Sequence, residues 1–242
     1  MSRRRVDDAA AHVLHAHPFS ESSLIIEVFA REHGRLAVLA RGARRPRSAL
    51  RGVLHPFQPL ELAWFGGGEV KTLARAEWIG GHPFLHGGAL LPAYYLNELL
   101  LRLLPREDAH AQLYDIYAAT LAALANAGGG EGAAAHLRRF EKHLLREIGY
   151  GLQLARDMHG EALSACGRYR YHVERGATPD DGAENSDGVL VSGSTLLELD
   201  ADLCVTPRSL AESKQLMRYL LSHHLAGAPL HTRRVFIDLQ DV

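Results

Sequence analysis

The chain has 242 residues and a formal net charge of −1, with 47% hydrophobic and 23% charged residues, a composition typical of a globular protein with one or two domains. Its two cysteines, Cys166 and Cys204, exclude a disulfide-rich secreted framework and favour a reducing cytoplasm. The longest apolar run, residues 89–104, contains Glu98 and Arg102 and is too short and too polar to span a bilayer. The basic start MSRRRVDDAAAHV lacks an apolar core, so we expect no signal peptide.

The first eighty residues predict β-strands and no convincing helix. Apolar and β-branched runs alternate with short turns rich in glycine, serine or proline, and they lie at residues 12–19, 22–31, 35–41, 55–64 and 70–79. Five strands without a helical crossover indicate a small antiparallel barrel or sandwich.

The periodicity becomes helical after GGHPF (80–84). Helices are expected over 92–105, from Asp108, over 133–148, and from Ser209 with Glu212 at capping-box spacing. The polar stretch 175–188 is rich in turn-forming residues and predicts a mobile loop. The fold class is therefore an α+β multidomain protein, with a β domain over 1–81 and a mainly α-helical domain over 82–242.

Positive charge is concentrated in one short segment. Residues 1–81 hold 12 Lys and Arg against 8 Asp and Glu, whereas residues 82–242 hold 15 against 20. The run from His33 to Leu60 contains no carboxylate but six arginines, namely Arg35, Arg41, Arg44, Arg45, Arg47 and Arg51. A local basic field on a nearly neutral protein indicates a polyanionic partner for one face.

Arginine side chains suit a phosphate backbone, because the planar guanidinium group donates in a fork and stays charged at any working pH. Lys71 on the fifth strand is expected to extend the basic surface. Trp64 and Phe65, beside the predicted hairpin, are expected to stack on bases. We therefore predict nucleic-acid binding. A solubilising loop, an adaptor that meets an acidic protein surface and an RNA-binding module remain alternatives.

No pattern supports a metal centre or an enzyme active site. Asp157, His159, Glu161, Cys166 and His172 lie within sixteen residues, but no pair among them has C-x-x-C or H-x-x-x-H spacing. The sequence contains no P-loop and no clear paired-carboxylate or metal nuclease motif. We expect a protein without catalytic activity, metal or cofactor.

The helix expected over 135–154 offers a second candidate surface. Arg138, Arg139 and Lys142 border an apolar stripe that includes Phe140. One interpretation is a solvated helix face over a core stripe. The other is a groove for an acidic partner peptide, with an apolar floor and a basic rim.

Four segments together carry a resemblance to a known family. They are VLHAHPFSESSLIIEVFAREHGRLAVLARGARRPRSAL, PFQPLELAWFGGGEVKTLARAE, RRFEKHLLREIGYG and PLHTRR. Their order across the chain resembles the bacterial recombination and repair family RecO. Each segment alone is a weak signal, and the set is specific.

The resemblance implies an N-terminal OB-fold, a helical C-terminal domain and binding to single- and double-stranded DNA. It implies annealing of complementary strands and, with RecR, loading of recombinase onto DNA coated by single-stranded-DNA-binding protein. It also implies that the helical domain binds the acidic C-terminal tail of that coating protein. We expect a cytoplasmic, nucleoid-associated protein.

The chain departs from this family in one respect. Many RecO-like proteins carry two C-x-x-C pairs just after the G-Y-G stretch, which form a zinc site. In this chain, Cys166 is the only cysteine of residues 151–173. A four-cysteine zinc site is therefore impossible, and we expect packing alone to hold the region.

Overall fold

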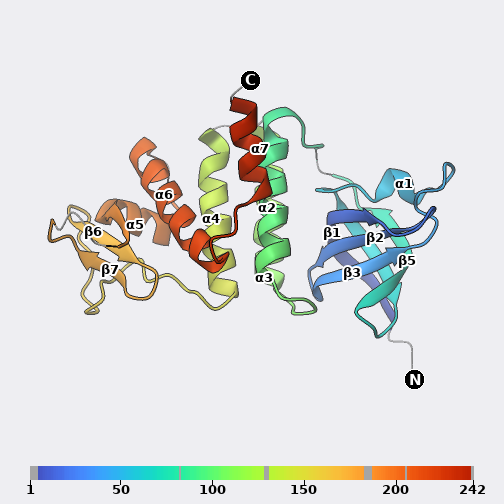
Figure 1. Ribbon diagram of the computed structural model, residues 1–242, viewed down its shortest axis with the longest axis horizontal. Helices are drawn as coiled ribbons and strands as arrows, with labels where there is room; N and C mark the ends of the chain where they lie inside the picture. Colours follow the sequence, from blue (N-terminus) through green and yellow to red (C-terminus); the bar gives the residue numbers. More distant parts are fainter. Residues whose placement is uncertain (1–4, 82, 128–130, 183–186, 205, 241–242) are drawn as a thin grey trace. The chain divides into compact units, whose positions relative to one another are not determined.

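The computed structural model describes residues 5–81, 83–127, 131–182, 187–204 and 206–240 (Figure 1). The contacts divide the chain into two compact units, one of Met1–Gly129 with Val235–Val242 and one of Gly130–Arg234. The sequence placed a division after residue 81, whereas the contacts group the first two long helices with the β domain. Each unit is described by itself.

The first unit contains a closed five-stranded barrel. Its strands are β1 (Arg5–Pro18), β2 (Leu24–Ala30), β3 (Gly34–Ala40), β4 (Pro59–Phe65) and β5 (Val70–Trp78), in the order β1-β2-β3-β5-β4. All neighbours pair antiparallel except β3 and β5, which are parallel. This arrangement confirms the predicted OB-fold barrel. Apolar side chains with almost no exposure fill it, including Val13, Ile26, Val28, Leu36, Val38, Leu60 and Leu62.

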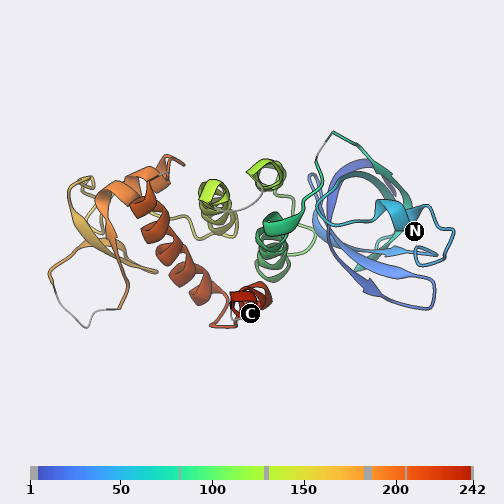
Figure 2. The same cartoon turned by 90° about the horizontal axis from the view of Figure 1, so that it is seen from above.

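The connection from β3 to β4 has to pass β5, because β5 lies between those two strands in the barrel. Residues 41–58 make this crossover and include the short helix α1 (Leu50–Val53). Ala43 and Leu54 belong to the barrel core, and Leu50 and Val53 pack against it. Figures 1 and 2 both show α1 over one end of the barrel. The crossover is therefore anchored by its apolar residues.

Two helices complete the first unit. The turn η1 (Gly87–Ala89) leads into α2 (Leu90–Leu103), and α3 (Ala111–Ala127) follows. The buried Asn97 side chain donates to the carbonyl of Leu14 on β1 at 2.8 Å and accepts the Tyr117 hydroxyl at 2.6 Å. Burying an amide without partners costs several kcal/mol in hydrocarbon, so these bonds fix where α2 and α3 sit against β1.

The second unit combines helices with a small sheet. Its helices are α4 (Glu131–Glu147), α5 (Gly193–Asp200) and α6 (Pro207–His224), and its antiparallel sheet has the order β7-β6-β8. The strands are β6 (Arg168–His172), β7 (Gly176–Pro179) and β8 (Val189–Ser192). The last helix of the described residues, α7 (His231–Gln240), is divided between the units, because its residues from Val235 on are grouped with the first. No helix in the described ranges is long and apolar enough to cross a membrane.

The sheet corrects the expected loop over 175–188. Residues Gly176–Pro179 form β7, whose Ala177 and Thr178 pair with Tyr171 and Arg170 of β6. The strands are only four or five residues long, too short to give a clear alternation against the neighbouring turn-forming residues. Residues 183–186 of the expected loop lie outside the described residues.

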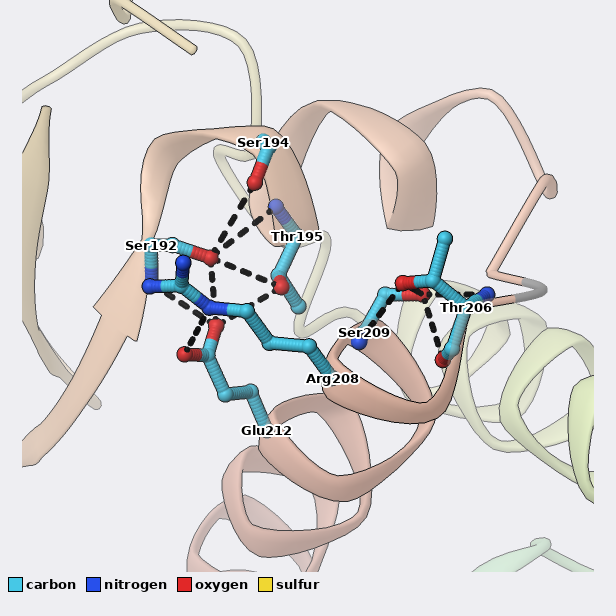
Figure 3. Close-up of polar contacts among 7 residues, drawn as sticks. All are labelled: Ser192, Ser194, Thr195, Thr206, Arg208, Ser209 and Glu212. Atoms are coloured by element: carbon cyan, nitrogen blue, oxygen red, sulfur yellow. Dashed lines mark hydrogen bonds and ion pairs between the residues drawn. The ribbon is translucent and has the colours of Figure 1, made fainter. Parts of the chain in front are cut away.

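Glu212 on α6 is a polar anchor of the second unit (Figure 3). Its Oε2 accepts the Ser192 amide at 2.9 Å, the Ser192 hydroxyl at 2.5 Å and the Thr195 hydroxyl at 2.7 Å. Its Oε1 accepts from Arg208 at 3.0 Å. The carboxylate therefore sits at the N-terminus of α5, where unpaired amides favour negative charge.

The capping box of α6 differs from the expected pair of Ser209 and Glu212. Thr206 is the N-cap, its hydroxyl accepts the Ser209 amide at 3.1 Å, and the Ser209 hydroxyl accepts the Thr206 amide at 3.1 Å (Figure 3). Ser209 is therefore the N3 residue of the box, and Glu212 is free to join α5 to α6.

The Glu212 carboxylate predicts a pH-dependent stability. Burial pushes its pKa up, but the hydrogen bonds from Ser192, Thr195 and Arg208 outweigh burial and lower the pKa from 4.5 to about 2. The stabilisation is complete above the ordinary pKa and is lost as pH falls from about 4.5 towards 2. Glu212→Gln should lower the free energy of unfolding at pH 7 by about 1–3 kcal/mol.

Urea denaturation at pH 7 and pH 3 measures this effect. The difference between wild type and Glu212→Gln should shrink at pH 3, because the carboxyl is protonated in the unfolded chain below its ordinary pKa of 4.5 and unfolding then takes up a proton. Glu174→Gln, which changes an exposed carboxylate of the same unit, should leave stability unchanged at both pH values. A Glu212→Gln loss that is equal at the two pH values would contradict the prediction.

Candidate nucleic-acid interface

Most cations of the first unit are paired with carboxylates. Arg31 contacts Asp115 at 2.8 Å, Arg35 contacts Glu27 at 3.3 Å, and Lys71 contacts Glu107 at 2.7 Å. The same holds for Arg5 with Asp7, Arg75 with Asp8, Glu61 and Glu77, Arg102 with Glu98, and Arg106 with Glu27. These ion pairs neutralise the barrel walls and the loop between α2 and α3.

The remaining arginines of the described part of this unit all lie on the crossover. Arg41, Arg44, Arg45, Arg47 and Arg51 are exposed, and no carboxylate lies within ion-pair distance of them in the described residues. We call these five the arginine loop. Among the described residues of the unit, the loop carries the positive charge that no carboxylate balances, so a polyanion is attracted there.

Hydrogen bonds give the arginine loop a defined backbone. Gly42 has a φ of +71°, a left-handed conformation that favours glycine, and it turns the chain away from β3. Successive turns follow, with Arg45 donating to the Gly42 carbonyl at 3.1 Å and Ser48 donating to the Arg45 carbonyl at 3.0 Å. Arg44 ties the loop to the β1–β2 hairpin, because its guanidinium donates to the Ser20 carbonyl at 2.7 Å.

Three residues predicted to bind DNA have structural positions instead. Arg35 is largely buried and also donates to the Leu104 carbonyl at 3.0 Å. Lys71 is buried and donates to the Gly68 carbonyl at 2.7 Å besides its pair with Glu107. Trp64 is 3% exposed in the barrel core, so it cannot stack on a base without opening the barrel. Their assignment to the DNA contact is corrected.

The exposed aromatic pair of the barrel unit was missed by the sequence reasoning. Trp78, at the end of β5, is 48% exposed, Phe84 is 61% exposed, and their ring centroids lie 5.9 Å apart. The alternation of side chains along residues 70–79 does not predict that Trp78 is exposed. Trp78 pairs with the buried Leu60, and it is exposed because β5 ends there.

The prediction of a peptide groove on α4 is wrong for three of its four residues. Phe140 is fully buried, and Arg138 is buried in an ion pair with Glu141 at 2.7 Å. Lys142 donates to the carbonyls of Leu199 and Asp200 at 2.9 and 2.8 Å, at the C-terminus of α5. Arg138, Phe140 and Lys142 therefore hold the second unit together.

Arg139 is the member of the predicted groove that reaches solvent. Its side chain is 48% exposed and lies 3.3 Å from Asp202, which also contacts Lys142 and His143. Burial pushes the pKa of Asp202 up, and the hydrogen bonds from Lys142 and His143 outweigh it, so the pKa lies below its ordinary value. Asp202 is thus a carboxylate held by three cationic or ionisable side chains of α4.

The segment from Asp157 to His172 is organised by hydrogen bonds. The Asp157 carboxylate accepts the amides of His159 and Glu161 at 2.8 and 3.0 Å. The Tyr169 hydroxyl accepts the Ser164 amide at 2.8 Å. In the described ranges, no three His, Cys, Asp or Glu side chains are grouped to hold a metal ion.

Comparison with known proteins gives matches over nearly the whole chain. The family model "Recombination protein O N terminal" matches residues 6–82, and "Recombination protein O C terminal" matches residues 87–234. The DNA repair protein RecO of Dechloromonas aromatica is 53% identical over 240 residues, covering 99% of both chains. The RecO of Ralstonia nicotianae is 49% identical over 239 residues, covering 99% of this chain and 87% of its own. The chain belongs to the RecO family.

Membership in the RecO family places the chain in DNA repair and recombination. The zinc site expected of many RecO-like proteins does not fit its residues. Cys166 is exposed and is the single cysteine of residues 151–173, while the turns at Asp157 and Ser164 are closed by hydrogen bonds.

The separation of paired and unpaired cations predicts unequal effects on stability. Lys71→Met should lower the free energy of unfolding by about 1–2 kcal/mol, because it removes the bonds to Gly68 and Glu107. Arg45→Met should change it by less than about 0.5 kcal/mol, because Arg45 is exposed and makes no ion pair. Urea denaturation at neutral pH compares the two variants, and equal losses would contradict the division of roles.

Proposed function

We propose that this chain is a DNA-binding recombination mediator whose arginine loop holds the phosphate backbone of single- and double-stranded DNA. The observation that carries the proposal is the distribution of ion pairs. The barrel walls are neutralised, whereas Arg41, Arg44, Arg45, Arg47 and Arg51 project from an anchored crossover without carboxylate partners. Phosphate contacts of this kind position nucleic acid without reading its sequence, so we expect little base specificity.

We propose further that the chain anneals complementary strands. Two phosphate backbones repel each other, and a basic surface that neutralises one or both lowers this barrier. Annealing needs no nucleophile and no metal, which agrees with a site built of guanidinium groups. Bound to the chromosome, the protein would act at the nucleoid.

Two protein partners complete the proposal. Membership in the RecO family supports joint action with RecR in loading recombinase onto DNA coated by single-stranded-DNA-binding protein. For the acidic C-terminal tail of the coating protein we propose the exposed face of α4 around Arg139. The contacts of Asp202 support this proposal. Arg139, Lys142 and His143 on this α4 surface already bind the Asp202 carboxylate, so the surface suits the carboxylates of an acidic tail.

The DNA proposal predicts the salt dependence of binding. Replacing Arg44, Arg45 and Arg47 together with alanine should weaken single-strand binding and annealing in parallel. The slope of log affinity against log salt should shrink by about 2, because each lost phosphate contact removes about 0.7 for a single strand. Fluorescence anisotropy with a labelled oligonucleotide at several salt concentrations measures the slope.

Arg31→Ala and Arg75→Ala provide matched controls, since both side chains are 40% exposed but paired with carboxylates. Neither should change the slope measurably. A triple variant with full affinity and an unchanged slope would move the DNA site elsewhere. An RNA strand of the same sequence tests the RNA-binding alternative, and absence of binding to either strand would favour a protein adaptor.

The tail proposal predicts a separate effect at α4. Arg139→Glu should weaken binding of a labelled acidic tail peptide by about 1.5–3 kcal/mol, because it replaces a charged donor with a repelling carboxylate. DNA binding should stay nearly unchanged, since Arg139 lies in the second unit. Anisotropy titrations with the peptide and with DNA measure the two affinities side by side.

Arg175→Glu serves as the control, because it makes the same charge change at another exposed position of that unit. It should leave peptide affinity intact. If Arg139→Glu loses DNA and keeps the peptide, the two sites have been assigned the wrong way round. Equal loss of peptide binding in both variants would indicate a general effect of net charge.

A further inference from the structure

A hollow of about 300 Å³ lies beside two arginines of the arginine loop, Arg44 and Arg51. It is lined by Leu24, Ala43, Arg44, Leu50, Arg51 and Leu54. All six residues belong to the barrel unit, and the hollow lies between the first residue of β2 and the crossover. Its lining joins apolar side chains to two members of the arginine loop.

The apolar part of the lining is fixed by the barrel. Ala43 and Leu54 are buried in the core, and Leu24 and Leu50 are half-buried against it. Arg44 is tethered through the Ser20 carbonyl, which leaves its other N–H groups free. A planar apolar group could therefore enter over the leucines, while an attached anion meets Arg44 or Arg51.

We propose that this hollow is a slot for one unstacked nucleobase of single-stranded DNA, whose neighbouring phosphates contact Arg44 and Arg51. The inference rests on the proposed function and specifies which part of the DNA the site takes beyond phosphate. A nucleobase has the required combination, because it is flat, largely apolar on its faces and joined on both sides to an anion. Guanidinium planes also stack on unpaired bases.

The charge pattern favours a nucleic-acid strand over an acidic peptide. Five exposed guanidinium groups follow one another along residues 41–51 without a carboxylate among them, which suits the regular charges of a phosphate chain. Each nucleotide of the strand carries both a phosphate and a base, so a base can occupy the slot whichever phosphates contact the arginines. The slot therefore distinguishes single strands, whose bases are free, from duplexes, whose bases are stacked.

The test compares two single strands of equal length and equal phosphate number, one of thymidine and one made entirely of abasic sites. A fully abasic strand is needed because a single missing base would be avoided by a shift of register. Wild type should bind the thymidine strand at least about fivefold more tightly, the gain expected from burying part of an apolar ring face. Both affinities should fall with salt.

Leu50→Gln tests the slot itself, because it makes the floor polar without adding charge. It should reduce the preference for the thymidine strand to about twofold or less while leaving affinity for the abasic strand intact. Leu73→Gln is the matched control, since Leu73 also packs half-buried against the barrel core but does not line the hollow. It should keep the wild-type preference, and thermal denaturation checks that both variants fold.

The possible outcomes separate the two proposals. Equal, salt-dependent binding of both strands by wild type would overturn the slot and leave phosphate binding standing. A preference that survives Leu50→Gln would place the base contact elsewhere and overturn the slot. Failure to bind either strand would overturn the DNA-binding function together with the slot.

Discussion

Closure of the barrel is the constraint on which the candidate site depends. The parallel pairing of β3 with β5 leaves β4 on the far side of β5, so the chain between β3 and β4 has to cross one end of the barrel. Ala43, Leu50 and Leu54 anchor this crossover, because they bury apolar surface against the barrel. Arg44, Arg45, Arg47 and Arg51 lie between these anchors, Arg41 lies just before Ala43, and all five are exposed. The fold thus presents the positive charge on an anchored segment.

The placement of carboxylates makes that charge effective. Glu27 on β2 meets Arg35 and Arg106, Glu107 meets Lys71, and Asp115 on α3 meets Arg31. Three of these pairs join the barrel to the chain around α2 and α3, the fourth joins β2 to β3, and none of the carboxylates contacts the crossover arginines in the described residues. A protein of net charge −1 can therefore attract a polyanion at one surface, because its opposite charges are separated in space.

In the second unit several charged groups hold the fold together. Lys142 binds the last carbonyls of α5, Arg138 neutralises the buried Glu141, and Glu212 fills the N-terminus of α5. Each of these contacts satisfies a helix end or a buried charge. Arg139 differs because its side chain is half-exposed beside Asp202. An acidic ligand at this surface would compete with a carboxylate of the chain itself.

The sequence by itself determined the five strands, the order of a β domain before a mainly helical one, and the arginine-rich segment without carboxylates. These features depend on local alternation, turn residues and composition, all of which can be read along the chain. The tertiary structure decided which cations remain unpaired. Arg35 and Lys71 have the same side-chain chemistry as surface cations, yet their partners Glu27 and Glu107 lie on other segments of the chain. It also decided that Trp64 is buried and Trp78 exposed, because strand pairing and strand ends set the face and depth of each side chain. The hollow among Leu24, Leu50 and Leu54 likewise exists only once the crossover lies against β2, since Leu24 is far in sequence from Leu50 and Leu54.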